Sequence, residues 1–277
     1  MNKILINGKN DNRISVNDRA FQYGDGIFET IAYKNNTLIY WNEHIQRLNH
    51  ACRILQLNII DEKIWLNDIK KVISDNQQDL VIKLIYSRGE GQRGYKIAEP
   101  VEPVRVVMSS PLPVYADELH DSGVKLMVCK TPASSNSRLA GIKHLNKLDN
   151  VLARNEWSDD KIFEGLMLDD YGNVIEGTMT NLFAVKNNSL YTPILKRSGV
   201  NGIIRQRIID LAKNDNIVTQ QIEIKLDKLL EMDEIFISNS LIGLCPVKQI
   251  DNNQYKIGSI TKRLMNKLQQ DTNGREL

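Results

Sequence analysis

The chain reads IEGTMTNLF between residues 175 and 183, and this stretch is the clearest local indication of how the chain folds. Just upstream, residues 169–173 read DDYGN, a run of turn-forming residues that predicts a tight hairpin. Just downstream, residues 181–185 and 190–192 are short, mostly apolar runs that predict strands. Glu176 therefore stands after a hairpin turn and directly before a strand.

Working outward, the rest of the C-terminal half alternates between predicted strands and helices. Short apolar runs predict strands at residues 124–129, 165–168, 217–224 and 234–238. Residues 202–213 and 259–269 predict helices, and Leu145, Leu148 and Leu152 have the spacing of another helix that continues to Trp157. Residues 131–138 hold three serines and a proline, which predicts a loop ahead of that helix.

The N-terminal half predicts a separate α+β domain. Its expected strands cover residues 3–7, 27–33, 38–40, 80–87 and 104–109. An apolar stripe of Ile45, Leu48, Cys52 and Leu55 predicts one helix, and residues 61–74 predict a second. Pro111 and Pro113 then interrupt any strand ladder. We therefore expect a smaller N-terminal α+β domain over residues 1–113 and a larger C-terminal domain over residues 114–277.

Composition limits the classes of function. The chain has 277 residues and a formal net charge of only +2, which gives no basic field for binding a nucleic acid. It has no recognisable secretory signal and no apolar run long enough for a membrane helix. Its three cysteines are far apart, which favours reduced thiols and no metal site. These features predict a cytoplasmic protein whose main partner is a small molecule, with no nucleic acid and no membrane.

Lys143 is the first candidate for chemistry. It lies in GIKHLNKLDN at residues 141–150, after the serine-rich loop and just before the predicted helix. A lysine amine that loses charge through burial can form a Schiff base with a carbonyl. The simpler interpretation is a solvated surface lysine, so the case for catalysis depends on other segments.

Three further elements have the chemistry that pyridoxal phosphate requires of a protein. Glu176 can keep a pyridine nitrogen protonated, although alone it could be an exposed acid at a strand end. Residues 199–205 read GVNGIIR, which places glycines before a helix whose first amides can bind an anion. Arg47 lies beside the apolar stripe of the first helix and could reach a phosphate, or it could form a surface ion pair.

Taken together, these segments resemble the fold type IV pyridoxal-phosphate enzymes, also called branched-chain aminotransferase-like, along nearly the whole chain. The resemblance rests on QYGDGIFET at residues 22–30, HIQRL at 44–48, Lys143, EGTMTN at 176–181 and GIIR at 202–205. It implies a homodimer of two-domain α+β subunits, the C-terminal domain being barrel-like and carrying the cofactor lysine, with pyridoxal 5'-phosphate bound between the domains.

The resemblance also implies roles for individual residues. Lys143 would be the Schiff-base lysine and Glu176 the partner of the pyridine nitrogen. Arg47, the backbone amides of Ile203 and Ile204, and Ser240 would hold the phosphate. Many members have threonine where this chain has Ile204, so only the backbone amide can serve at that position.

Two segments resemble the aminodeoxychorismate lyases within the family, GEGQRGY at residues 89–95 and LAGIKHLN at 139–146. The substrate of these lyases is a dianion, and we expect its carboxylates and ring to meet Arg93, Tyr95, Arg88 and Phe28. D-amino-acid aminotransferases instead carry a histidine two residues after the arginine, where this chain has Tyr95.

Two alternatives remain open on sequence grounds. A branched-chain or D-amino-acid aminotransferase would use the same lysine, glutamate and phosphate residues. A catalytically silent dimeric binding protein of the same fold would have no need to retain both Lys143 and Glu176.

Overall fold

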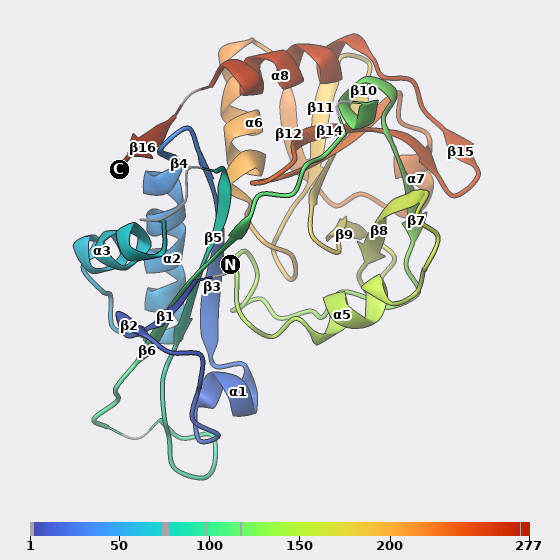
Figure 1. Ribbon diagram of the computed structural model, residues 1–277. Coiled ribbons are helices and arrows are strands. Elements are labelled where there is room, and N and C mark those ends of the chain that lie inside the picture. The colour runs from blue at the N-terminus through green and yellow to red at the C-terminus, as the bar shows by residue number, and fades with distance from the viewer. Residues whose placement is uncertain (1–2, 74–77, 98, 117, 272) are drawn as a thin grey trace. The chain divides into compact units, whose positions relative to one another are not determined.

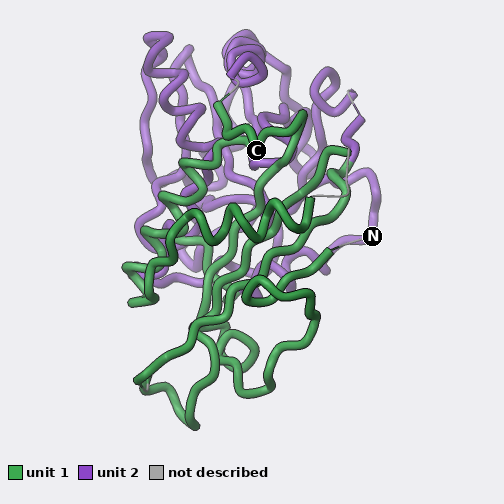
Figure 2. The backbone as a smooth tube through the Cα atoms, turned by 60° about the vertical axis from the view of Figure 1, so that its left-hand side comes forward, with its two compact units in different colours: residues 1–113, 142–146, 273–277 green, residues 114–141, 147–272 purple. Residues whose placement is uncertain are grey.

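The computed structural model describes residues 3–73, 78–97, 99–116, 118–271 and 273–277. The chain divides into two compact units (Figure 2). Unit 1 consists of Met1–Pro113, Ile142–Asn146 and Asn273–Leu277, and unit 2 consists of Val114–Gly141 and Lys147–Thr272. The first break follows Pro113. Two segments expected in the C-terminal domain group with unit 1 instead, namely the one that contains Lys143 and the last five residues.

Unit 1 is built on an antiparallel sheet whose described strands follow the order β16-β4-β3-β5-β6-β1-β2 (Figure 1). The two long central strands, β3 and β5, pair with each other from Gly26 and Ser87 at one end to Tyr33 and Leu80 at the other. The strand bounds are β1 Ile4–Ile6, β2 Lys9–Asn10, β3 Gly26–Lys34, β4 Thr37–Ile39, β5 Leu80–Ser87, β6 Val104–Pro111 and β16 Gly274–Glu276.

Two helices cover one face of this sheet, α2 (Trp41–Leu55) and α3 (Glu62–Ile73), which confirms the predicted helices over these residues, while residue 74 lies outside the described ranges (Figure 1). The apolar stripe of α2 is buried at Ile45, Leu48 and Cys52. A third helix, α1 (Arg19–Tyr23), is not indicated by the apolar pattern because it spans only five residues. The end of the chain belongs to unit 1 because β16 pairs with β4.

Unit 2 contains a mixed sheet with described strands in the order β12-β11-β10-β13-β14-β7-β8-β9. The last strand, β9, comes back into contact with β10 and β11, so the sheet curls on itself. The strand bounds are β7 Val124–Val128, β8 Ile162–Leu168, β9 Val174–Gly177, β10 Asn181–Lys186, β11 Ser189–Pro193, β12 Thr219–Ile222, β13 Glu234–Asn239, β14 Gly243–Ile250 and β15 Asn253–Gln254, which pairs with β14.

The helices of unit 2 are α4 (Glu118–Ser122), α5 (Leu148–Arg154), α6 (Ile203–Asn214), α7 (Leu226–Leu230) and α8 (Ser259–Gln270). The two long helices, α6 and α8, pack against each other and on β13 and β14 (Figure 1). The strands of this unit also contribute a cluster of buried, mostly aliphatic side chains that includes Leu182, Ile235, Ile237 and Val247.

The helix predicted to contain Leu145 is wrong at its start, because α5 begins only at Leu148. Residues 143–145 follow β3 instead: Phe28 N donates to Lys143 O at 3.0 Å and Leu145 N donates to Gly26 O at 3.0 Å. The supposed packing stripe is also wrong, since Leu148 is 70% exposed and Leu152 is 55% exposed. Pairing with β3 therefore overrides the helical spacing.

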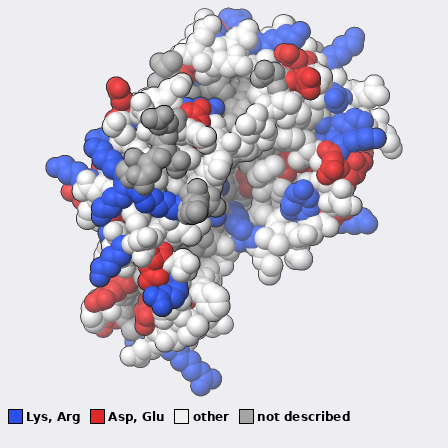
Figure 3. All heavy atoms as spheres, in the orientation of Figure 1, with Lys and Arg blue, Asp and Glu red and all other residues white. Residues whose placement is uncertain are grey.

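Charges of both signs are intermixed over the face of the molecule in Figure 3, as expected for a net charge of +2. Within the described residues, no helix combines the length and the apolar composition that a membrane span requires.

Candidate active site

Lys143 is fixed by its backbone to β3 of unit 1. Besides the two hydrogen bonds on either side of it, His144 forms an isolated bridge with Ile27. Its side chain is half-buried, and Nζ lies 4.2 Å from the centroid of the Phe28 ring. A cation at that distance is attracted to the ring face, so Phe28 helps to orient the lysine amine.

Beside Phe28 on the same strand, Glu29 is buried against two cations or potential cations of α2. Arg47 donates from Nε to Oε1 at 2.8 Å and from Nη2 to Oε2 at 2.6 Å. His44 Nδ1 lies 2.6 Å from Oε2. Burial opposes the charge on Glu29, but the positive charge of Arg47, its hydrogen bonds and the contact from His44 outweigh burial and lower the pKa of Glu29 to about 2.

His44 is itself fully buried, and burial lowers its pKa despite the neighbouring Glu29. Its neutral imidazole donates from Nδ1 to the carboxylate, as the geometry allows. The bidentate contact with Glu29 fixes the plane of the Arg47 guanidinium. The predicted phosphate contact of Arg47 remains a prediction.

Glu176 lies at the end of β9 in unit 2, and its hydrogen bonds tie it to the loop that precedes α6. Its Oε2 accepts from Asn181 Nδ2 at 3.1 Å and from Val200 N at 2.8 Å. Asn181 Nδ2 also donates to Val200 O at 2.8 Å. These bonds hold the carboxylate in one orientation, and the residue is buried, with 7% of its surface exposed.

The α6 N-terminus adjoins this carboxylate in the same unit. Its N-cap is Gly202, which has no side chain to cap the first amides, and the first helical bond runs from Gln206 N to Gly202 O. A Cβ on Gly202 would lie 2.0 Å from Asn181 Oδ1. The close approach requires glycine at residue 202, and the anion contact of the Ile203 and Ile204 amides remains a prediction.

Ser240 lies half-buried in the turn between β13 and β14. Asn239 shapes this turn, because its Oδ1 accepts from Leu241 N and Ile242 N at 2.9 Å each. Asn239 Nδ2 also donates to Met179 O at 3.3 Å, which joins the turn to the residues that follow Glu176. Ser238 is a further candidate that the sequence did not indicate: its buried hydroxyl has no hydrogen-bond partner among the described residues.

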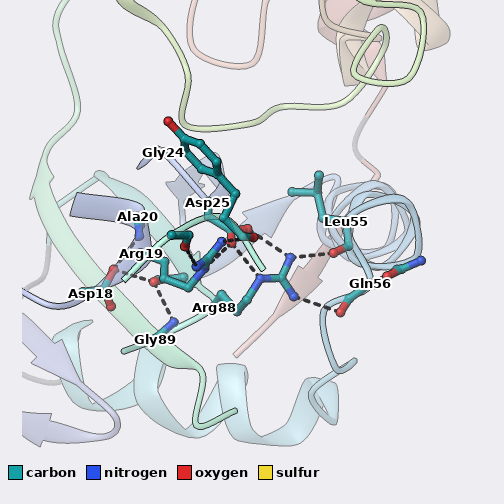
Figure 4. Close-up of polar contacts among 12 residues, drawn as sticks. Asp18, Arg19, Ala20, Gly24, Asp25, Leu55, Gln56, Arg88 and Gly89 are labelled. Atoms are coloured by element: carbon teal, nitrogen blue, oxygen red, sulfur yellow. Dashed lines mark hydrogen bonds and ion pairs between the residues drawn. The ribbon is translucent and has the colours of Figure 1, made fainter. Parts of the chain in front are cut away.

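The four predicted substrate residues belong to unit 1, and the structure places them differently. Phe28 faces Lys143, whereas Arg93 and Tyr95 are exposed on the loop after β5. Arg88 is only 4% exposed and is committed to protein groups: it donates to both oxygens of Asp25 and to the carbonyls of Leu55 and Gln56 (Figure 4). Those contacts give Arg88 a structural role, and we do not assign it to the substrate.

Sequence reasoning also missed Glu164 on β8. This fully buried carboxylate accepts from the amides of Gly165, Thr178 and Met179 and from the hydroxyls of Thr178 and Thr180. Burial raises its pKa. Because two of these amides and both hydroxyls belong to residues 178–180, Glu164 fixes the loop between Glu176 and Asn181. An acid two residues after the start of an apolar strand carries no local signal of this role.

The sequence profile of the amino-transferase class IV family matches residues 26–250. The chain belongs to this family. Its members use pyridoxal 5'-phosphate, and its fold is the fold type IV architecture expected from the sequence.

Individual members of the family were also matched over almost the whole chain. The aminodeoxychorismate lyase of Vibrio harveyi is 34% identical, over 95% of this chain and 98% of its own. The crystal structure of 4-amino-4-deoxychorismate lyase from Pseudomonas aeruginosa is 35% identical, with a TM-score of 0.92 over 97% of this chain and 98% of its own. The branched-chain amino acid aminotransferase of Escherichia coli is 25% identical, with a TM-score of 0.85 over 98% and 94% of the two chains.

The residues present fit the family's cofactor. Unit 1 offers a lysine amine held against an aromatic ring, and unit 2 offers a buried carboxylate beside a helix N-terminus that lacks a side-chain cap. No group of His, Cys, Asp and Glu side chains in the described parts of the chain could hold a metal ion.

Proposed function

We propose that this protein is an aminodeoxychorismate lyase, which converts 4-amino-4-deoxychorismate to 4-aminobenzoate and pyruvate. The observation that carries the proposal is its similarity, over nearly its full length, to two lyases that share about a third of its residues. Tyr95 in place of the histidine of D-amino-acid aminotransferases supports the same choice.

Pyridoxal phosphate, when bound, supplies an electron-withdrawing ring that stabilises negative charge on the carbon beside the substrate amine. Lys143 is the residue we assign to the bond with the cofactor and, once released from it, to proton removal from C4 of the substrate. The enolpyruvyl C–O bond on the neighbouring carbon then breaks and the six-membered ring becomes aromatic. Enolpyruvate takes up one proton on carbon and leaves as pyruvate, so the substrate is split without any other reactant.

Other residues are assigned to binding. Glu176 would keep the cofactor's ring nitrogen protonated, which lowers the energy of the charge that develops as C4 loses its proton. The Ile203 and Ile204 amides, Ser240 and Arg47 would hold the phosphate. Arg93 and Tyr95 would meet the substrate carboxylates, and Phe28 would keep the Lys143 amine in place.

The test is fluorescence of 4-aminobenzoate after purified protein, pyridoxal phosphate and aminodeoxychorismate are mixed, with Lys143→Ala protein beside it. Product from the unsubstituted protein alone supports the proposal. The lyase proposal fails if neither protein forms product while the unsubstituted protein still shows the borohydride-sensitive absorbance band of the bound cofactor. Transamination of branched-chain or D-amino acids then becomes the leading function.

We also propose that the protein acts as a homodimer in the cytoplasm and that its product enters folate biosynthesis. The homodimer is testable by light scattering of the cofactor-loaded protein. A monomeric mass at micromolar concentration would contradict it.

A further inference from the structure

A cluster of ion pairs in unit 1 joins α1 and the residues after it to the loop that carries Arg93 and Tyr95. Arg19, at the start of α1, donates from Nε to Asp25 Oδ2 at 2.8 Å, and Arg88 donates from Nε to the same oxygen at 2.7 Å (Figure 4). The side chains of both arginines are less than a tenth exposed. Burial disfavours a charged Asp25, but its hydrogen bonds to Arg88 and Arg19 lower the pKa of its carboxyl.

The two arginines hold two different parts of the loop between β5 and β6. Arg88 fixes its base, since its guanidinium also reaches the carbonyls of Leu55 and Gln56. Arg19 fixes its middle, because Nη1 donates to Gly94 O and Nη2 donates to Tyr95 O, each at 3.1 Å. A single guanidinium thereby determines the orientation of two successive peptide groups directly after Arg93.

Further contacts bring the loop down onto Arg19. The Arg19 amide donates to Gly89 O at 2.8 Å. A Cβ on Gly91 would come within 2.7 Å of Arg19 Cδ, so the chain passes directly over this side chain. Gly94 has a φ of +100° with nothing near a Cβ, so backbone conformation and not packing requires glycine there. The ring of Tyr95 also lies edge-on to Tyr23 of α1, with 5.4 Å between centroids.

The loop presents its side chains outward from this fixed backbone. Tyr95 is 84% exposed, and Arg93 is also exposed. Burying two guanidinium groups and one carboxylate is expensive, and apolar side chains of similar volume would stabilise a fold at least as well. The cluster is therefore better explained by the geometry it imposes on the loop than by stability.

We propose that Arg19 is a positioning residue for substrate recognition: by holding the Gly94 and Tyr95 carbonyls, it presents Arg93 and the Tyr95 hydroxyl to a carboxylate of the substrate. This inference rests on the proposed lyase function. Arg19 itself does not touch the substrate. Its loss removes binding that the substrate and the transition state share, which raises KM and leaves kcat nearly unchanged.

The experiment compares Arg19→Gln, Arg19→Lys and Arg93→Gln in the cofactor-loaded protein, by 4-aminobenzoate formation and by amide hydrogen exchange of residues 91–97. We expect Arg19→Gln to raise KM about 10- to 100-fold, the value of one charge-assisted hydrogen bond, with faster exchange in the loop. Lysine keeps the positive charge beside Asp25 but lacks the planar guanidinium that donates to both carbonyls. Arg19→Lys should therefore raise KM less than Arg19→Gln does. Arg93→Gln should raise KM to a similar extent without faster exchange.

Arg13→Gln is the matched control, because Arg13 is an exposed arginine of the same unit paired with Asp11. It should change neither KM nor exchange. An unchanged KM in Arg19→Gln despite faster exchange in the loop would overturn the inference. A lower kcat together with a higher KM and weaker cofactor binding would overturn it as well. Absence of 4-aminobenzoate from the unsubstituted protein would instead refute the proposed function, and the exchange data would still show whether Arg19 holds the loop.

Discussion

The Lys143 amine and the Phe28 ring are in contact within unit 1, with 4.2 Å between Nζ and the ring centroid. The next residue on that strand, Glu29, carries the buried contacts with His44 and Arg47. One strand therefore positions both the lysine assigned to catalysis and the arginine assigned to the phosphate. The predictions for unit 1 follow from this arrangement.

Replacing Lys143 with alanine or arginine should abolish the borohydride-sensitive visible band and lower the rate of 4-aminobenzoate formation by at least about 10²–10⁴-fold, the usual value of a general base. Arginine keeps a cation over Phe28 but cannot bond to the cofactor or accept a proton at C4. Retention of the band in either variant would show that another lysine holds the cofactor.

Replacing Glu29 with glutamine should lower the free energy of unfolding by about 3–5 kcal/mol, because one partner of a buried ion pair is removed. It should also weaken cofactor binding, since Arg47 loses its fixed orientation. Urea unfolding and a cofactor titration measure the two effects. Glu62→Gln is the control: Glu62 pairs with Arg275 at the surface, so its loss should cost at most about 1 kcal/mol.

His44 predicts a pH dependence of stability. Its pKa is lowered in the folded protein from 6.5, so the unfolded chain binds a proton more readily than the folded one below that value. The stability present above about pH 6.5 is therefore lost as the pH falls toward the folded-state pKa. Glu29 adds a similar loss of stability only below pH 4.5, as the pH falls toward its folded-state pKa of about 2. Thermal unfolding of His44→Gln between pH 7 and 5 should show a shallower slope, and an unchanged slope would exclude His44 as its source.

Much of this arrangement was predictable because local patterns and tertiary contacts agree there. The stripe of α2 is buried as its spacing predicts, and β3, β5 and β10 lie where apolar runs predict strands. Glu176 and the glycines before α6 were recognisable because hairpins and helix N-termini have local signatures. The partners of these residues could not be predicted in the same way.

The failures occur where distant segments decide the local structure. Leu145 has helical spacing, but the hydrogen bond to Gly26 draws it to β3. Strand β14 was not indicated, because Gly243 and Pro246 interrupt its apolar pattern. Its pairing with β7 begins only at Val247, one residue after Pro246. The roles of Arg19 and Glu164 depend on backbone groups many residues away, and no short sequence window contains that information.

In unit 2, Gly202→Ala should weaken cofactor binding by about tenfold or more, because the new methyl would overlap Asn181 Oδ1 and displace the α6 N-terminus. Equilibrium titration with pyridoxal phosphate measures the effect. Gly172→Ala is the matched control in the same unit, because nothing lies within 4 Å of its Cβ position. It should cost stability through its φ of +75° and leave the affinity unchanged. Equal affinities in the two variants would argue against phosphate binding at α6.

Glu176→Gln and Glu164→Gln should separate charge from support within the same hairpin. A glutamine carbonyl at residue 176 can still accept from Asn181 Nδ2 and Val200 N, so these two bonds are kept while the negative charge is lost. We expect kcat to fall about 10²–10³-fold, the value of one preorganised electrostatic group, with little change in unfolding free energy.

Glutamine at residue 164 has a different consequence, because donors meet both oxygens of Glu164 and the new NH₂ group would face Met179 N or Thr178 N. That variant should lose about 1–3 kcal/mol of stability through an unsatisfied buried donor, and the hairpin should exchange amide hydrogens faster. Denaturant unfolding and single-turnover product formation, measured on both variants, distinguish the two roles. If Glu176→Gln lowers stability as much as Glu164→Gln while its kcat is retained, the carboxylate of Glu176 supports the loop and has no part in the chemistry.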